Sequence, residues 1–221
     1  MFEIERKLKS NNFDLKKEIS KQNKNKLDEG CYVYELEADT TIPSELIILM
    51  HFRGEIDIKL QEKIKNYLLN KQDKKGGWPL FFDGEPNLST SVKAYFALKL
   101  AGEKDNSKSM VRARKLIHKM GGAQNVNVFT KITLALFGQI SWNTIPYMPP
   151  EIMRFPRWFP FTIYKISYWS RTVLIPLLII MYKKPIANNP NVINIAELFT
   201  HKINNIPSNG NNKLSSFFFL K

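Results

Sequence analysis

Cysteine and histidine are scarce in this chain of 221 residues. The sequence holds one cysteine, Cys31, and three histidines, His51, His118 and His201. A single cysteine excludes a disulfide scaffold and any zinc site built from several cysteines. The histidines lie 67 and 83 residues apart, so they form no local cluster of metal ligands. We therefore predict that the protein has no metal site.

Common fingerprints of nucleotide-binding and hydrolase sites are also missing. The chain contains no Gly-x-Gly-x-x-Gly, no Gly-x-x-x-x-Gly-Lys-Ser/Thr and no Gly-x-Ser-x-Gly motif. Its first ten residues, MFEIERKLKS, are charged from position 3 and include no apolar run of the kind that a secretory signal needs. We expect a protein without a signal peptide, in a reducing cytoplasmic setting.

Positive charge is in excess, with 33 Lys and Arg against 20 Asp and Glu, a net charge of +13. Residues 1–30 hold eight basic and six acidic side chains, which is typical of a solvated, salt-bridged helix. Residues 152–221 hold nine basic side chains against one acid, Glu197, and are rich in aromatic and aliphatic residues. This combination suits a membrane surface at least as well as nucleic acid. The alternative is that Lys, Asn and Ile are over-used along the whole chain. No RNP-type pattern or zinc-finger spacing is present, so we predict no nucleic-acid partner.

Apolar spacing of three to four residues predicts helices along most of the chain. Ser44 is expected to cap the first helix, and Ser89 or Thr90 the third. Five prolines between positions 146 and 160 exclude a regular helix there. Strand patterns are scarce, so the predicted class is all-α, built from antiparallel helix pairs. The helices are expected at 44–53, 55–72, 89–101, 107–120, 126–138 and 163–182.

The last of these helices is the most apolar segment of the chain. Its uncharged part, Thr172 to Tyr182, is 11 residues long, and Arg171 precedes it. A membrane-spanning helix needs about 20 apolar residues. We therefore predict a buried or interfacial helix rather than a transmembrane one.

Tyr67, Leu68, Gln72, Gly76 and Trp78 resemble the Gln–Trp repeat of the triterpene cyclases. In that motif Gln72 and Trp78 would tie the end of one helix to the start of the next. Further segments are similar, in the same order, to bacterial squalene–hopene cyclases. These segments are 35–43, 76–81, 91–99, 127–131, 150–153, 158–161 and 167–173.

The resemblance implies a fold, a chemistry and a location. Squalene–hopene cyclases are stacked α/α toroids that sit monotopically on a membrane and cyclise squalene through carbocations, without a metal or cofactor. The chain would then hold an incomplete α/α toroid at residues 31–200, between a charged segment at 1–30 and an Asn-rich tail at 201–221. Its partners would be squalene or a related isoprenoid and the cytoplasmic face of a membrane.

The acid that starts cyclisation in this family belongs to an Asp-x-Asp-Asp motif, which these 221 residues do not contain. The seven aspartates all lie at least ten residues apart. The chain therefore resembles the N-terminal part of a cyclase, and we predict that it is inactive alone and has no catalytic residue of its own. The alternative source of a catalytic acid and base is the group Glu35, Glu37 and Asp39. Their spacing of two residues would place them on one face of a strand. The resemblance instead implies that these carboxylates have a structural role, in which they bind backbone groups or Arg side chains.

The resemblance assigns three residues to the substrate path. Trp169 would line the cavity, and Ile166 and Leu174 would line the constriction of its entry channel; an ordinary core position is the alternative for Trp169. Trp158 and its neighbours Phe159 and Phe161 would face the bilayer or pack between two toroids.

Two further functions are open at this point. The chain could be one half of a split cyclase that needs a separate C-terminal half, or a non-catalytic α/α module bound to a membrane. A related prenyltransferase toroid requires a zinc set of Asp, Cys and His, and no such grouping is present in the sequence.

Overall fold

The structure is a computed structural model, and it describes residues 39–160, 162–187 and 193–200. The chain divides into two units, Met1–Glu37 and Ala38–Lys221, and all described residues belong to the second. Within the described ranges the regular structure is helical, with a single isolated β-bridge between Pro79 and Pro86. The predicted all-α class is confirmed.

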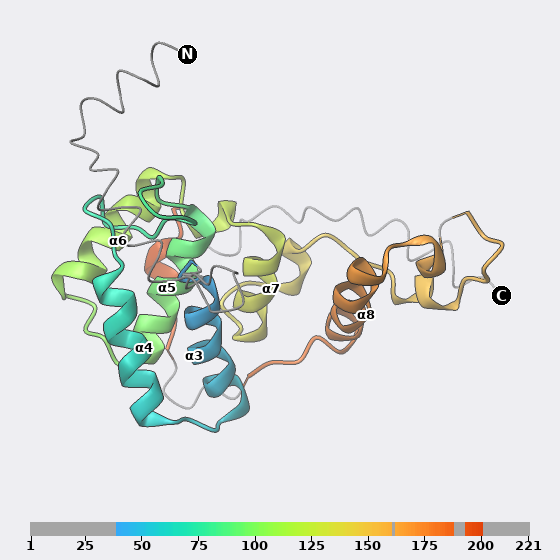
Figure 1. Cartoon of the computed structure of the whole chain (residues 1–221), viewed down its shortest axis with the longest axis horizontal. Helices are drawn as coiled ribbons and strands as arrows, with labels where there is room; N and C mark the ends of the chain where they lie inside the picture. Colours follow the sequence, from blue (N-terminus) through green and yellow to red (C-terminus); the bar gives the residue numbers. More distant parts are fainter. Residues whose placement is uncertain (1–38, 161, 188–192, 201–221) are drawn as a thin grey trace, which may run out of the picture. The chain divides into compact units, whose positions relative to one another are not determined.

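Six α-helices carry the fold of the described residues (Figure 1). Short 3₁₀ helices η1 to η5 lie between and after them, at Ala123–Asn125, Trp142–Thr144, Pro150–Arg154, Ile163–Lys165 and Ala196–Leu198. The α-helices are α3 (Thr41–Arg53), α4 (Ile58–Asn70), α5 (Leu88–Leu100), α6 (Lys108–Lys119), α7 (Val128–Leu136) and α8 (Tyr168–Lys183).

Helix α5 is the centre of the core. It contacts α3, α4, α6 and α7, and its residues from Thr90 to Leu98 are all buried. The sequence predicts one inward face, at Val92, Phe96 and Leu100, whereas the structure buries α5 on every side. This arrangement follows from its position, because a helix with neighbours all round has no solvent face. The inward face predicted for α6, made of Met110, Ala113 and Ile117, is confirmed.

Side-chain caps define where most of these helices begin. Asp57, Asn87, Ser107, Asn127 and Ser167 each accept a hydrogen bond from a backbone N–H in the first turn of the helix that follows. Such caps satisfy N–H groups that have no partner inside the helix.

Two predicted caps are wrong. The first helix begins at Thr41, and Ser44 lies inside it, where its hydroxyl donates to the Thr40 carbonyl oxygen at 2.6 Å. The third helix is capped by Asn87 rather than by Ser89 or Thr90. Asn is a strong capping residue, and in this position its side chain reaches the Thr90 N–H at 3.2 Å.

The proline-rich stretch contains only short 3₁₀ helices, as its composition predicts. Helix α8 follows it and continues through Pro176, with Leu178 and Met181 buried. Among the helices of the described ranges, none combines the length and hydropathy needed to cross a membrane.

Residues 193–200, which we call the C-terminal strap, pack back onto the core. Ile195 and Leu198 are fully buried, and Phe199 is nearly so. The side chain of Gln139 holds the strap at two points, donating to the Ile193 carbonyl at 3.1 Å and accepting from the Ile195 N–H at 2.8 Å. The strap therefore closes the core over α5 and α6.

Candidate functional site

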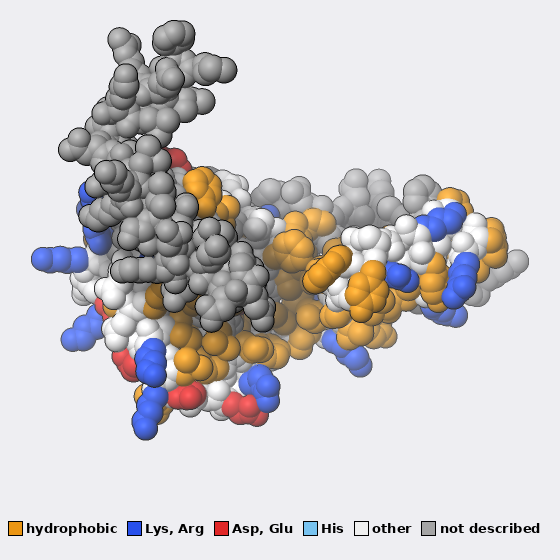
Figure 2. All heavy atoms as spheres, viewed as in Figure 1, with side chains coloured by type: hydrophobic (Ala, Val, Ile, Leu, Met, Phe, Trp, Pro, Cys, Tyr) orange, Lys and Arg blue, Asp and Glu red, His pale blue; other side chains and the backbone are white. Residues whose placement is uncertain are grey.

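An open apolar groove of about 560 Å³ lies between α7 and α8. Helix α7 contributes Val128 and Phe129, and the loop that follows contributes Met148. Helix α8 provides the other side with Trp169, Ser170, Val173, Leu174 and Leu177. Hydrophobic side chains form a band over these two helices in Figure 2. A groove of this composition suits a hydrocarbon rather than a polar ligand.

The groove contains two of the three predicted substrate residues. Trp169 and Leu174 both line it, whereas Ile166 lies before α8, is half-buried and is not among the lining residues. Trp169 is 81% exposed, so it is not an ordinary core tryptophan. Phe129, also exposed, faces the same groove although the sequence did not single it out. It lies in segment 127–131, one of those that resemble the cyclases, but the resemblance assigned it no role.

The Gln–Trp motif joins three helices. The amide nitrogen of Gln72 donates to the carbonyl oxygens of Gly76 at 2.8 Å and of Ser109 at 2.9 Å. Its amide oxygen accepts from the Ser109 hydroxyl at 2.7 Å and from the Arg112 guanidinium at 2.8 Å. All four bonds of the Gln72 side chain therefore stay within the turn or reach α6.

Trp78 completes the motif from a fully buried position. Its indole N–H donates to the Leu68 carbonyl in the last turn of α4 at 2.8 Å, and its backbone N–H donates to the Ser91 hydroxyl in the first turn of α5 at 3.0 Å. Gly76 has a φ of +97°, and a Cβ there would lie 2.8 Å from the backbone of Arg112. The motif thus ties the end of α4 to the start of α5, as predicted, and also to α6.

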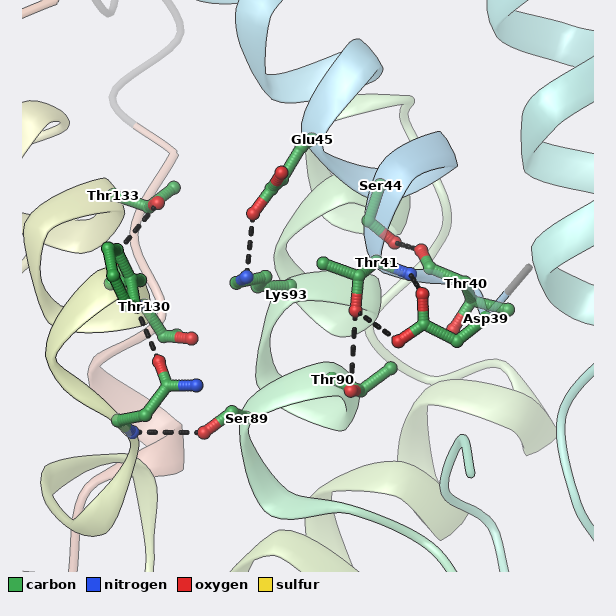
Figure 3. Close-up of polar contacts among 12 residues, drawn as sticks. Asp39, Thr40, Thr41, Ser44, Glu45, Ser89, Thr90, Lys93, Thr130 and Thr133 are labelled. Atoms are coloured by element: carbon green, nitrogen blue, oxygen red, sulfur yellow. Dashed lines mark hydrogen bonds and ion pairs between the residues drawn. The ribbon is translucent and has the colours of Figure 1, made fainter. Parts of the chain in front are cut away.

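A polar cluster lies between α3, α5 and α7 (Figure 3). Lys93, whose side chain is 7% exposed, donates to the Glu45 carboxylate at 2.6 Å. Two buried hydroxyls, of Thr40 and Thr130, have no hydrogen-bond partner. A buried ammonium needs a paired anion, so Glu45 compensates for the burial of Lys93.

Asp39 binds the first residue of α3. Its carboxylate accepts from the Thr41 N–H at 3.2 Å and from the Thr41 hydroxyl at 2.7 Å. This contact is the backbone binding that the resemblance implied for the segment. Glu35 and Glu37 lie outside the described residues, as does Phe161.

The strap brings a second set of ionisable groups together. The Glu197 carboxylate accepts from Tyr95 at 2.9 Å and from Lys99 at 2.5 Å, and the His118 ring contacts the Glu197 carbonyl oxygen at 2.7 Å. Burial alone raises the pKa of Glu197, but the hydrogen bonds, that from Lys99 foremost, outweigh it and leave this pKa below its usual value. Burial and the same carboxylate raise the pKa of Tyr95.

Metal ligands do not gather in the described ranges, where no three His, Cys, Asp or Glu side chains are placed to share an ion. His51 contacts the Gln61 amide at 2.8 Å and His118 contacts the strap. Both histidines therefore have partners within the fold.

The end of the proline-rich stretch presents an aromatic cluster of Phe155, Trp158 and Phe159, and Tyr164 follows it in η4. Trp158 is 79% exposed and packs edge-on against Phe159, whose ring lies 4.5 Å from that of Phe155. The Arg157 guanidinium lies 5.0 Å above the Tyr164 ring. Exposed aromatic rings beside cations are typical of membrane interfaces.

Comparison with known families identifies the domain. The sequence model of the squalene–hopene cyclase N-terminal domain matches residues 16–220. The chain belongs to this family. An α/α toroid is the fold of this domain, in agreement with the all-α structure and with the Gln–Trp motif.

Individual cyclases support the family. A squalene–hopene cyclase of Bradyrhizobium diazoefficiens is 52% identical over 172 residues, which cover 77% of this chain and 26% of that protein. The squalene–hopene cyclase of Schizosaccharomyces japonicus is 51% identical over 177 residues, 80% of this chain and 27% of that protein. The squalene–hopene cyclase of Alicyclobacillus acidocaldarius is 35% identical over 172 residues, which cover 78% of this chain and 27% of that protein. The chain spans about a quarter of the length of these cyclases.

The predicted boundaries at residues 30 and 200 and the roles of the three substrate residues stay predictions.

Proposed function

We propose that this chain is the N-terminal part of a squalene–hopene cyclase-type enzyme and forms part of the wall of its substrate cavity. The observation that carries the proposal is the groove between α7 and α8, where Trp169 and Leu174 lie beside Phe129. The cavity would take squalene or a related isoprenoid, whose hydrocarbon chain such a lining favours.

The groove offers the two things that a carbocation cascade needs from its walls. Its apolar side chains would exclude water once the rest of the enzyme covers the open groove, and water would otherwise trap the cation early. The Trp169 and Phe129 rings would supply negative π faces that stabilise positive charge. Ser170 is the one polar residue of the lining, so the groove holds no strong nucleophile.

Protonation of the substrate would depend on residues outside these 221. An isolated alkene needs a strong, positioned acid, and the sequence contains no Asp-x-Asp-Asp motif. The two acids that contact the central helix α5, Glu45 and Glu197, are each paired with a lysine. We therefore propose that the chain alone does not cyclise squalene and acts together with the C-terminal part of a cyclase.

A chimera tests the proposal. Residues 39–200 would replace the matching segment of the Bradyrhizobium diazoefficiens cyclase, and the 221-residue chain would be assayed in parallel with squalene. We expect polycyclic product, measured by gas chromatography and mass spectrometry, from the chimera and none from the chain alone. A well-folded chimera that makes no product would contradict the cavity role. Product from the chain alone would contradict the proposed need for an external acid.

The split-enzyme form of the proposal has its own test. The chain would be co-expressed with the remaining three-quarters of the Bradyrhizobium enzyme as a separate polypeptide. Product formation would favour a split cyclase. Co-purification without product would favour the alternative, a non-catalytic α/α module.

We also propose that the protein lies on the cytoplasmic face of a membrane as a peripheral protein. The exposed aromatic cluster around Trp158, with Arg157 beside it, supports this location because aromatic rings and cations share the headgroup region. Flotation with phosphatidylcholine vesicles tests it. We expect Trp158→Ser to weaken binding, and equal flotation of both proteins would exclude this surface.

A further inference from the structure

The groove between α7 and α8 is left open by the described part of the chain. Three of its side chains are more than half exposed, Trp169 at 81%, Phe129 at 55% and Val173 at 53%. Apolar surface of this kind is unfavourable in water, so the groove favours an apolar occupant. Its volume of about 560 Å³ falls among those of pockets that enclose small ligands, about 300–1,000 Å³.

The sequence downstream of the strap contains an apolar segment that could be this occupant. Residues 217–220 are Phe-Phe-Phe-Leu, which we call the Phe-rich segment, and Leu214 precedes them. These positions lie outside the described residues. Leu214, Phe217 and Phe218 have the i, i+3, i+4 spacing of one helix face, and an apolar groove between helices accepts such a face. Residues 201–213, HKINNIPSNGNNK, are rich in Asn and have the composition of a linker.

The strap brings the start of this linker near the groove. The Thr200 N–H donates to the Gln124 side-chain oxygen at 3.4 Å, and the Gln124 amide nitrogen donates to the Thr200 hydroxyl. Gln124 lies in η1, four residues before Val128, which lines the groove. Four residues span at most about 15 Å, so Thr200 lies within about 25 Å of the groove once the Gln124 side chain is included.

The linker has the length that this distance requires. Phe217 follows Thr200 by 17 residues, since 217 − 200 = 17. A chain of that length reaches about 56–61 Å when fully extended, and a random coil of that length has an average end-to-end distance of about 21–25 Å. The average reach therefore matches the span, which is the condition for the highest effective concentration of a tethered group, on the order of millimolar.

We propose that the Phe-rich segment binds in the groove between α7 and α8 of the same chain. It would cover Trp169 and Leu174 and compete there with an isoprenoid. The competition rests on the proposed function, whereas the contact itself needs only the apolar groove. The contact would continue the interface that the strap already makes with the core. A second copy is the less favoured occupant, because without the tether it would need a millimolar concentration to match it.

Photo-crosslinking in the full chain tests the contact. The photoreactive residue p-benzoylphenylalanine would replace Phe218, and mass spectrometry would locate the cross-linked peptides. We expect cross-links within one chain, to the segments around Phe129 and Trp169, at a yield that is independent of protein concentration. The same probe in place of Phe82, which is 93% exposed on a loop, is the control. It should cross-link to these two segments severalfold less.

Binding of the uncharged dye phenylnaphthylamine shows whether the groove is occupied. The variant Phe217→Ser, Phe218→Ser, Phe219→Ser should bind the dye severalfold more tightly than the wild type, because the competing segment is lost. Adding Trp169→Ala should remove most of this gain. Phe81→Ser with Phe82→Ser replaces two other exposed rings and should not raise the affinity.

Three results would overturn the proposal. Cross-links that form only between chains would assign the groove to a second copy. Cross-links from position 218 that are distributed like those from position 82 would show no specific contact. A folded serine variant with unchanged dye affinity would show that the groove is free. If that variant does not fold, the cross-linking decides, since it changes a single ring. The chimera contains only residues 39–200, so its activity tests the proposed function separately.

Discussion

The indole nitrogen of Trp78 lies 2.8 Å from the carbonyl oxygen of Leu68, inside a fully buried site. Leu68 is in the last turn of α4, where helix carbonyls lack partners within the helix. The tryptophan therefore acts as a side-chain cap for the C-terminal end of α4.

Replacing this tryptophan by phenylalanine keeps a ring and removes the donor. We expect Trp78→Phe to lower the free energy of unfolding by about 1–3 kcal/mol, because the Leu68 carbonyl stays buried without its partner. Denaturant unfolding followed by circular dichroism would measure the loss. Trp158→Phe is the matched control and should cost less than about 0.5 kcal/mol, since Trp158 is largely exposed.

Gly77 and Gly84 allow the effect of steric crowding on stability to be compared with that of an uncrowded loop substitution. A Cβ at Gly77 would lie 2.5 Å from Leu116 and 2.7 Å from Pro86, whereas one at Gly84 would meet only the exposed ring of Phe81. Gly77→Ala should therefore destabilise the protein by about 1–3 kcal/mol. Gly84→Ala should be near neutral. Equal effects in thermal melts would show that the turn can relax around a methyl group.

The buried ion pair predicts an asymmetry between its partners. Glu45→Ala leaves the Lys93 ammonium buried and unpaired, with an expected cost of about 1–3 kcal/mol after allowing for the partial exposure of Glu45. Lys93→Met removes the buried charge and should cost less. The double variant should be more stable than Glu45→Ala alone. At the exposed pair of Lys75 and Glu85, Glu85→Ala should change stability by less than about 0.5 kcal/mol.

Acid should loosen the strap through Glu197. The pKa of this carboxyl is lower in the folded protein than in the unfolded chain, so its stabilising effect is complete above the unfolded pKa. It is lost as the pH falls from about 4.5 through the lower folded value. Glu197→Gln should therefore flatten the pH dependence of the free energy of unfolding in this acidic range. An unchanged slope below pH 5 would contradict the pairing with Lys99.

Trp169 should matter for chemistry and hardly at all for folding. Because its side chain is mostly exposed, Trp169→Ala should change the stability of the chain by less than about 0.5 kcal/mol. In the chimeric cyclase the same substitution should lower or redirect product formation, since it removes one π face from the groove. A normal product profile would remove Trp169 from the proposed cavity. Tyr182→Ala, on the same helix and outside the groove lining, is the control.

The parts of the fold that depend on local pattern could be predicted. Periodic apolar positions predicted each of the six α-helices in the described ranges, although the last begins at Tyr168 rather than at residue 163, and the Gln–Trp motif predicted the links at Gln72 and Trp78. Helix starts were less accurate, because Ser44 and Ser89 have capping chemistry but stand inside helices that begin after Thr40 and Asn87, and Asn87 itself supplies the cap of α5.

Features that depend on distant contacts could not be predicted. The burial of Lys93 follows from Glu45, 48 positions away, and from the central place of α5. The strap has no apolar periodicity, and the roles of Gln139 and Glu197 become visible only once the strap lies against the core. In the groove, Trp169 and Leu174 came from family resemblance, whereas the place of Phe129 became visible only once α7 and α8 were seen to line the same groove.

The strap also sets when this domain can finish folding during synthesis. Tyr95 and Glu197 are 102 residues apart, so α5 leaves the ribosome long before the segment that covers it. At ordinary elongation rates the interval is about 5–20 s. Throughout that time the apolar side chains beneath the strap are open to water and to neighbouring nascent chains. Translation speed, rather than helix formation, therefore determines how long the growing polypeptide needs protection from aggregation.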